Sequence, residues 1–113
     1  MQLTQLSLEE YQKKAIETAI YGSGNRVAYP ILGLVGEAGE LANKYKKVLR
    51  DDDGLLTSDK KEDLIKELGD VLWYCANLAN DLGTDLNVVA QINLEKLQLR
   101  AKNGTIKGSG DNR

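Results

Sequence analysis

A pattern of paired carboxylates occurs twice in the chain, thirty positions apart, and it strongly limits the possible fold. Glu37 and Glu40 form the first pair, and Glu67 and Asp70 form the second. Residues three apart lie one above the other on the same face of a helix, so each pair predicts a helix with an acidic face. Two such faces repel each other unless a cation lies between them. The pattern therefore predicts two neighbouring helices that hold a divalent metal, and Mg²⁺ and Mn²⁺ prefer oxygen ligands of this kind.

An apolar stripe runs beside each acidic face at the spacing of a helix. The first stripe contains Leu34, Ala38, Leu41, Tyr45 and Val48, and the second contains Leu64, Leu68, Val71, Cys75 and Leu78. Because the angle between apolar and acidic faces is the same in both, the helices can pack as an antiparallel pair with converging acids. Gly39 and Gly69 lie inside these helices, where each costs about 1 kcal/mol relative to alanine. Their presence predicts that the two backbones approach closely there.

Four helical segments are expected, which makes the fold class all-α. We predict a single domain over residues 1–113, a bundle of about four helices with the acidic site between the second and third. The first helix follows the cap Ser7 and runs to Tyr21, and the second begins near Pro30 and ends near Arg50. The third runs from Ser58 or Asp59 to Leu82, and the fourth, capped by Thr84, runs to Lys102. Trp73 falls outside the apolar stripe, and we expect a subunit interface, rather than a stacked base, to cover it.

The chain contains no histidine and one cysteine, which excludes several kinds of site. Ser-His-Asp and Cys-His catalysis is not available, and neither is a zinc site of the usual Cys/His kind. Di-iron bundles normally use Glu-x-x-His pairs, whereas both pairs here are acids, so the ligands point to Mg²⁺ or Mn²⁺. Cys75 is expected to be a small buried hydrophobe. Because one cysteine forms no disulfide within the chain, we expect a reducing cytoplasm.

The charge balance and the hydropathy pattern argue against nucleic acids and membranes as partners. Fifteen basic residues are scattered among seventeen acidic ones, for a net charge of −2, which argues against a nucleic-acid-binding surface. There is no long apolar run and no cationic leader followed by an apolar segment. We therefore expect neither a membrane span nor a signal peptide.

The acid pairs and their neighbours resemble the signature of the MazG-like nucleotide pyrophosphohydrolases. The resemblance rests on Tyr29-Pro30-x-x-Gly33-Leu34-x-x-Glu37-Ala38-Gly39-Glu40-Leu41, on Glu67-Leu68-Gly69-Asp70-Val71-Leu72-Trp73-Tyr74, and on similar spacing from Asn93 to Asp111. It extends over residues 7–111, nearly the whole chain. It implies hydrolysis of a nucleoside triphosphate, (d)NTP, to a monophosphate and pyrophosphate. It also implies a homodimer or a dimer of dimers, with each site completed by a neighbouring subunit.

The residues of the expected site follow from this match and from helical spacing. Glu37, Glu40, Glu67 and Asp70 would hold the metal and serve in catalysis, and which of them accepts the proton from water is left open. Lys44 lies one turn beyond Glu40, and Tyr74 one turn beyond Asp70, so both are placed to contact phosphate. Further candidates for substrate contact are Asn77, Asn93, Lys96 and Arg100.

The last eleven residues, 103–113, combine three glycines with basic side chains. Such a segment is too polar and glycine-rich to pack alone. We expect it to be mobile without substrate and to close over the nucleotide, in an oligomer at the neighbouring subunit's site.

Two alternatives to this function are kept open. The phosphoribosyl-ATP pyrophosphohydrolase of histidine biosynthesis shares the helical fold and the acid pattern. A non-catalytic helical adaptor belongs to a different class. The Gly33-Leu34-x-x-Glu37-Ala38-Gly39-Glu40 context favours the MazG-like group over the first, and four intact acids argue against the second.

Overall fold

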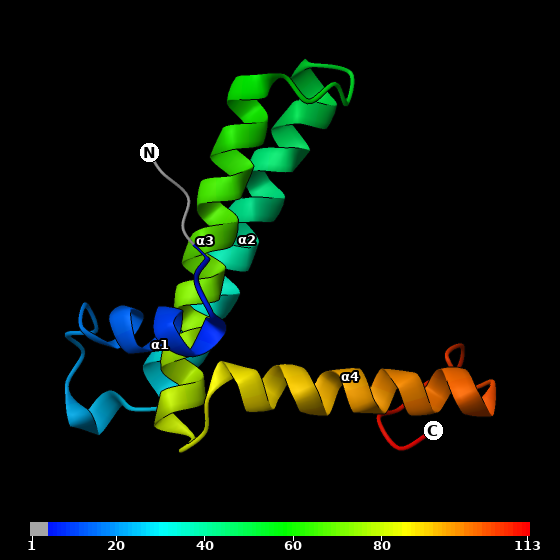
Figure 1. Cartoon of the computed structure of the whole chain (residues 1–113). Coiled ribbons are helices and arrows are strands. Elements are labelled where there is room, and N and C mark those ends of the chain that lie inside the picture. The colour runs from blue at the N-terminus through cyan, green and yellow to red at the C-terminus, as the bar shows by residue number, and fades with distance from the viewer. Residues whose placement is uncertain (1–4) are drawn as a thin grey trace.

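The computed structural model describes residues 5–113, and these form four α-helices and one short 3₁₀ turn (Figure 1). The helices are α1 (Leu8–Ile16), α2 (Ala28–Asp51), α3 (Ser58–Asp81) and α4 (Leu86–Asn103), and the turn η1 (Ser23–Asn25) precedes α2. No strand occurs within the described residues. The predicted all-α class with four helices is confirmed. None of these helices has the combination of length and apolar character needed to cross a membrane.

Side-chain caps begin three of the helices close to the predicted positions. The hydroxyl of Ser7 accepts a hydrogen bond from the Glu10 amide at α1, and that of Thr57 accepts one from the Lys60 amide at α3. The cap of α4 is Asp85 rather than the predicted Thr84. Gly83 follows the end of α3 with a φ of 77°, a conformation that suits glycine at a helix terminus.

Helix α1 ends at Ile16, five residues before the predicted end at Tyr21. The Thr18 hydroxyl donates a hydrogen bond to the Ala15 carbonyl (3.0 Å) and accepts one from the indole nitrogen of Trp73 (2.8 Å). Such local side-chain bonds compete with helix continuation. The contacts with α3 draw the chain out of the helical path.

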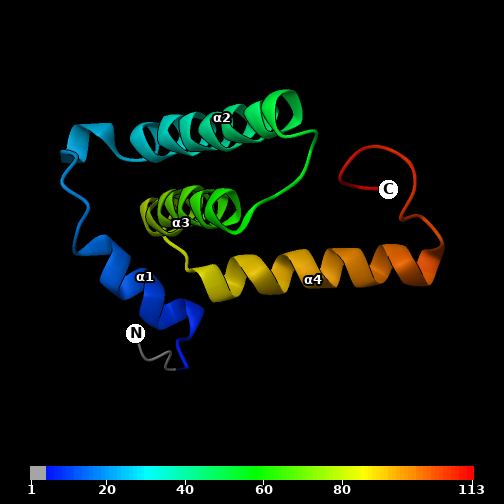
Figure 2. The ribbon, with the colours of Figure 1, turned by 90° about the horizontal axis from the view of Figure 1, so that it is seen from above.

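Helices α2 and α3 run antiparallel and side by side as a long hairpin (Figures 1 and 2). Helix α1 packs on the opposite side of α3 from α2, so α3 is the central helix. Helix α4 begins beside α1 and α3 and then runs away from the hairpin, across its axis. The hairpin turns the acidic faces of α2 and α3 toward each other.

The apolar core lies where α1, α3 and the start of α4 meet. Its buried members are Ala15, Ala76, Ala79 and Leu86, and Tyr11, Trp73 and Cys75 pack against it. Helix α1 and its C-terminal turn cover Trp73 only in part within the same chain, and the prediction that a subunit interface covers the rest stays a prediction. Burial raises the pKa of the Cys75 thiol, which keeps it protonated, as expected for a small hydrophobe.

Gln12 is a buried polar residue that the sequence pattern did not reveal. Its side-chain amide nitrogen donates to the Thr84 carbonyl (3.1 Å), and its amide oxygen accepts from the Leu86 backbone N–H (2.7 Å). The side chain thus satisfies backbone groups that the turn between α3 and α4 leaves without helical partners. It fixes the point at which α4 departs.

Much apolar surface remains exposed on the single chain. The radius of gyration is 17.0 Å, whereas a compact domain of this length has about 13 Å. Several side chains of the predicted apolar stripes are accessible, among them Leu68 at 57% and Tyr45 at 40%. One chain alone therefore does not bury its apolar faces.

Candidate active site

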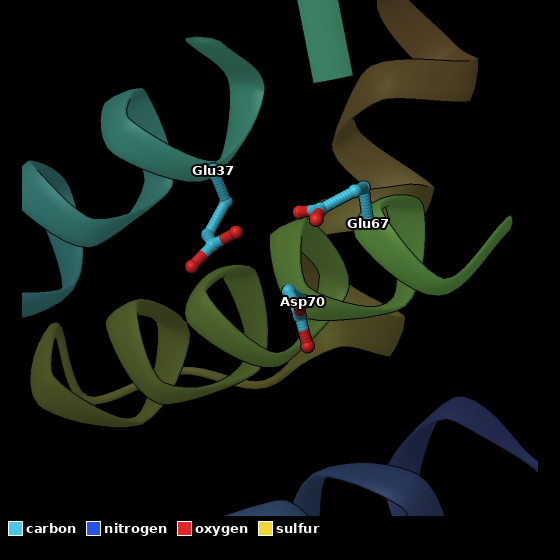
Figure 3. A group of neighbouring side chains, drawn as sticks. All are labelled: Glu37, Glu67 and Asp70. Atoms are coloured by element: carbon cyan, nitrogen blue, oxygen red, sulfur yellow. The ribbon is translucent and has the colours of Figure 1, made fainter. Parts of the chain in front are cut away.

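Three of the four predicted carboxylates converge between α2 and α3 (Figure 3). Glu37 comes from α2, and Glu67 and Asp70 come from α3. One carboxylate oxygen from each lies within 4.8 Å of the other two. The antiparallel hairpin brings them together because each helix carries its acids at the same angle to its apolar stripe. We call these three residues the acid cluster.

Glu40, the fourth predicted ligand, is exposed and does not belong to this group in the described part of the chain. It lies one turn beyond Glu37 on α2, and its charge helps to raise the pKa of Glu37. Its role as a ligand stays a prediction.

Lys44 contacts the acid cluster directly. Its ammonium nitrogen lies 2.8 Å from Oε1 of Glu67, whose side chain is only 14% exposed. This ion pair lowers the pKa of Glu67 and raises that of Lys44. The lysine therefore holds Glu67 in its ionised form.

The other oxygen of Glu67, Oε2, is buried without a hydrogen-bond donor among the described residues. Leaving such an atom unpaired is unfavourable, and more so for a charged group. A bound cation at this oxygen would remove the cost. The chemistry of the cluster, three carboxylates with one orphaned buried oxygen, fits a hard divalent metal.

The titration of Glu37 shows the same crowding of negative charge. The main cause that raises its pKa is a hydrogen bond to the Glu67 carboxylate, which Glu37 can donate only when it is protonated. Partial desolvation and the charges of Asp70, Glu67 and Glu40 raise it further. In the absence of a cation, the cluster thus favours a proton on Glu37, while Lys44 keeps Glu67 ionised. A divalent ion would let all three groups ionise together.

Tyr74 extends the site by one turn along α3, and its ring lies against the backbone of α2 at Gly33. A Cβ atom at residue 33 would overlap the Tyr74 ring. At Gly39 and Gly69, by contrast, a Cβ atom would have no neighbour within 4 Å among the described residues. The prediction of close backbone approach at Gly39 and Gly69 is therefore wrong within one chain, and the close approach is at Gly33, which the sequence pattern did not indicate.

The remaining predicted contact residues divide into two groups. Asn77 is 1% exposed, lies two turns beyond Asp70 and donates a hydrogen bond to the Trp73 carbonyl (3.0 Å). Asn93, Lys96 and Arg100 lie on α4, which leads away from the hairpin (Figures 1 and 2). The structure does not bring these α4 residues to the acid cluster of their own chain.

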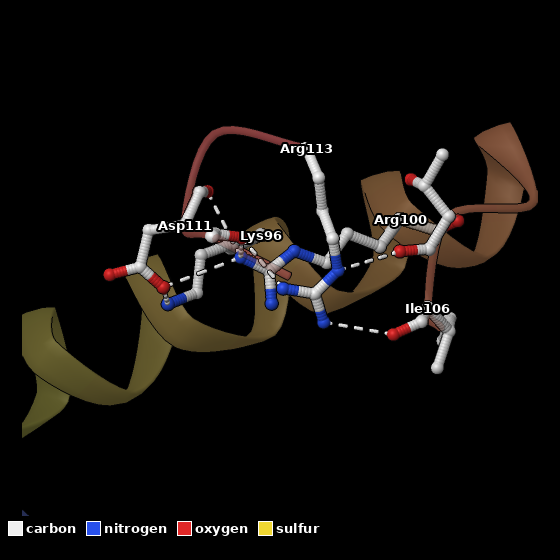
Figure 4. Close-up of polar contacts among 7 residues, drawn as sticks. Lys96, Arg100, Ile106, Asp111 and Arg113 are labelled. Atoms are coloured by element: carbon white, nitrogen blue, oxygen red, sulfur yellow. Dashed lines mark hydrogen bonds and ion pairs between the residues drawn. The ribbon is translucent and has the colours of Figure 1, made fainter. Parts of the chain in front are cut away.

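The tail after α4 folds back onto the helix (Figure 4). Asp111 accepts from Lys96 (3.2 Å) and from Arg100 (3.4 Å), and Arg100 also donates to the Asp111 carbonyl (2.9 Å). Arg113 donates to the carbonyls of Thr105 and Ile106. The mobility expected of the tail without substrate stays a prediction, and its contacts here occupy Lys96 and Arg100.

Comparisons with known proteins agree with this site. The model of the "MazG nucleotide pyrophosphohydrolase domain" matches residues 29–105, which contain all of α2 except its first residue, all of α3 and α4, and all four predicted carboxylates. The chain is 53% identical over 114 residues to the "Gene 37 protein" of Mycobacterium phage L5, covering 96% of this chain and 100% of that protein. No solved structure matches the chain. MazG domains are typically metal-dependent, which agrees with the acid cluster. The chain belongs to the MazG nucleotide pyrophosphohydrolase domain family.

Proposed function

We propose that the protein is a metal-dependent nucleoside triphosphate pyrophosphohydrolase that cleaves (d)NTPs to (d)NMP and pyrophosphate. The observation that carries the proposal is the acid cluster, with its buried and unpaired Glu67 oxygen, in a chain of the MazG family. The family match favours this activity over the phosphoribosyl-ATP enzyme and over a non-catalytic adaptor.

Glu37, Glu67 and Asp70, with Glu40 nearby, would hold Mg²⁺ or Mn²⁺. Such an ion neutralises phosphate oxygens and makes a coordinated water more nucleophilic. Within the cluster, Lys44 engages Glu67 but leaves Glu37 and Asp70 without an ion pair among the described residues. These two carboxylates are therefore better placed than Glu67 to accept the proton of the attacking water.

A cavity of about 210 Å³ lies beside Lys44. Lys44, Lys47 and Lys60 contribute three positive charges to its lining, and Asp63 contributes one negative charge. Phosphate groups are bound by lysines placed in this way. We assign this cavity to the terminal phosphates of the substrate, because it adjoins Glu67 through Lys44.

The products provide the direct test of this function. We expect cleavage between the α and β phosphates, so phosphorus NMR should show pyrophosphate and a monophosphate appearing together in a panel of (d)NTPs with Mg²⁺ or Mn²⁺. Attack at the α-phosphorus requires no phosphoenzyme, and the chain has no histidine to form one. Stepwise release of orthophosphate through a diphosphate would contradict the proposal.

We also propose that the protein is a homodimer or a dimer of dimers. The support is the large radius of gyration and an apolar cavity along the exposed face of α3, lined by Ile65, Leu68, Val71 and Leu72. A second copy of the chain could cover this face.

Leu68→Glu should therefore lower the mass measured by light scattering to that of a smaller species. A charge placed in an apolar interface is strongly unfavourable. Leu55→Glu is the matched control, because Leu55 is 70% exposed in the loop between α2 and α3 and should leave the mass unchanged. An unchanged mass for Leu68→Glu would exclude this face as the interface.

The tail is proposed to contact the nucleotide of a neighbouring subunit. Truncation after Ala101 removes Asp111, the partner of Lys96 and Arg100, together with the glycine-rich loop. We expect KM to rise or kcat to fall by at least about tenfold, near 1.4 kcal/mol, with the helical circular dichroism retained. Lys14→Ala is the control, since it removes one exposed lysine from α1, outside the tail, and should leave the kinetics unchanged. Unchanged kinetics after truncation would exclude the tail from the site.

A further inference from the structure

A second polar cavity, of about 250 Å³, lies toward the opposite end of α3 from the lysine cavity. Ile16 and Ala19 supply an apolar part of its lining. Its polar lining comprises Tyr21, Ser23, Arg26, Asn77, Asn80 and Asp81. The proposed chemistry at the acid cluster gives this cavity no role.

Asp81 holds the wall of this cavity in place. Its side chain is only 4% exposed, and its carboxylate lies 3.5 Å from the guanidinium nitrogen Nε of Arg26. The same carboxylate accepts hydrogen bonds from the Tyr21 hydroxyl (3.0 Å) and from the Val27 backbone N–H (2.9 Å). Burial and the bond to Asp81 raise the pKa of Tyr21 to about 12, so its hydroxyl stays protonated. These contacts fix Tyr21 and Arg26 before any ligand arrives.

The backbone at the cavity edge is strained. Val27 has φ 68° and ψ −56°, and the Ala28 N–H donates to the Arg26 carbonyl (2.7 Å). This geometry is that of the rare γ-turn, which is especially unfavourable for a β-branched residue. Such strain is unfavourable and persists only where the surrounding structure holds the backbone in place. Here the Asp81 carboxylate enforces it, and the turn keeps Arg26 at the cavity.

A row of aromatic rings connects this cavity to the acid cluster. Tyr21 stacks on Tyr29 with ring centres 4.7 Å apart and planes at 16°. The ring of Tyr29 lies 6.2 Å from that of Tyr74, and Tyr74 is one turn from Asp70. The path between the cavity and the carboxylates is therefore bordered by flat apolar surfaces.

The spacing suits one ligand that reaches both sites. Asn77 lies seven positions beyond Asp70 on α3, which is about 10.5 Å along the helix axis, a length that a sugar and a base together can bridge. Complete small-molecule sites usually have about 300–1,000 Å³. A cavity of about 250 Å³ is thus suited to one part of a larger molecule.

We propose that this cavity is the base subsite of the nucleotide, so that the substrate lies along α3 with its triphosphate toward Lys44, Lys47 and Lys60. The inference rests on the proposed function. The side-chain amide of Asn80 offers a donor and an acceptor to the edge of a base, and the guanidinium of Arg26 offers donors. Asn77 forms the floor of the cavity, because it is buried and bonded to the Trp73 carbonyl. The tyrosine row offers aromatic faces on which a base can stack.

Isothermal titration of the full-length protein tests this assignment without relying on hydrolysis. The probes are the α,β-imido analogues of the four common dNTPs and inorganic tripolyphosphate, which carries the phosphates but no base, all with Mg²⁺. The test variant is Asn80→Tyr, which fills the cavity with a larger side chain. Asn87→Tyr, at an exposed position on α4, is the matched control.

The wild-type protein should bind at least one analogue about tenfold or more tighter than tripolyphosphate. Asn80→Tyr should weaken binding of that analogue by about tenfold while leaving the tripolyphosphate affinity within about twofold. The control should match the wild type in both titrations. Equal affinity of the wild type for analogues and tripolyphosphate would overturn the inference, and so would unchanged analogue binding by folded Asn80→Tyr.

Arg26→Ala provides a second variant should Asn80→Tyr lose its helical circular dichroism, because the Arg26 side chain is 54% exposed and its loss leaves Asp81 with two donors. It should weaken analogue binding at least about threefold with unchanged tripolyphosphate binding. If Arg26→Ala binds the analogue as tightly as the wild type does, the inference is overturned.

Pyrophosphate release is measured separately. Base-selective binding without hydrolysis would contradict only the proposed function, whereas hydrolysis without base-selective binding would contradict only the base subsite.

Discussion

Glu67→Gln should lower kcat/KM for nucleoside triphosphates by about a thousandfold, near 4 kcal/mol of transition-state stabilisation. Glu67 is at the centre of the acid cluster, with one oxygen paired to Lys44 and the other buried and unpaired. An amide has the same shape but no charge, so it neither pairs with Lys44 nor binds a hard cation as strongly. Glu37→Gln and Asp70→Asn should have losses of similar size, and Glu40→Gln tests whether the exposed fourth acid is a ligand.

Glu62→Gln is the matched control for this series, because Glu62 is an exposed acid on the same helix outside the cluster. Steady-state pyrophosphate release with Mg²⁺ is the measurement, and excess EDTA should abolish the wild-type rate. Full activity in EDTA, or a Glu67→Gln enzyme as active as the control, would contradict the assignment of the cluster.

Thermal unfolding of the metal-free variants distinguishes lost catalysis from lost folding. The pKa of Glu37 is raised in the folded state, so its contribution to stability is present below its ordinary pKa of 4.5 and is lost as the pH rises through its folded value. Without metal at neutral pH, Glu37→Gln should therefore melt higher than the wild type. Added Mg²⁺ should stabilise the wild type more than the variant, because a ligand stabilises the form that binds it.

The pairing of α2 with α3 could be predicted from the sequence because it depends on local periodicity. Acids three apart and apolar residues at helical spacing determine which faces meet, and this was sufficient to anticipate the convergence of Glu37, Glu67 and Asp70. Caps such as Ser7 could likewise be read from neighbouring residues. Glu40 lies outside the acid cluster among the described residues, and its role as a fourth ligand stays a prediction.

Features that depend on contacts between distant residues could not be predicted. The early end of α1 follows from the bond between Thr18 and Trp73, which are 55 positions apart. The direction of α4 depends on Gln12, which is 74 positions from its partner Leu86. Neither bond follows a period along the chain. The same reason explains why glycine positions alone suggested the wrong site of close backbone approach.

The position of that close approach leads to the second prediction with a large effect. Gly33→Ala should destabilise the protein by about 1–3 kcal/mol, because the new methyl group enters space occupied by the Tyr74 ring. It should also lower kcat/KM by about 10–100-fold, since Tyr74 lies one turn from Asp70, and misplacement by about 1 Å has effects of this size. Chemical denaturation and steady-state kinetics measure the two effects.

Gly36→Ala is the matched control for Gly33→Ala, since it lies one turn further along α2 and a Cβ there meets no described atom within 4 Å. Alanine replaces glycine inside a helix with a gain in stability of about 1 kcal/mol, so this variant should be at least as stable as the wild type and equally active.

The double variant Gly33→Ala/Tyr74→Ala removes the clash and the ring together. It should recover much of the stability lost in Gly33→Ala but not the activity, because a coupling of this kind is specific to residues in contact. If Gly33→Ala behaves like Gly36→Ala in both measurements, then the Tyr74 ring does not depend on Gly33, and the close packing of α3 on α2 at this position plays no part in the site.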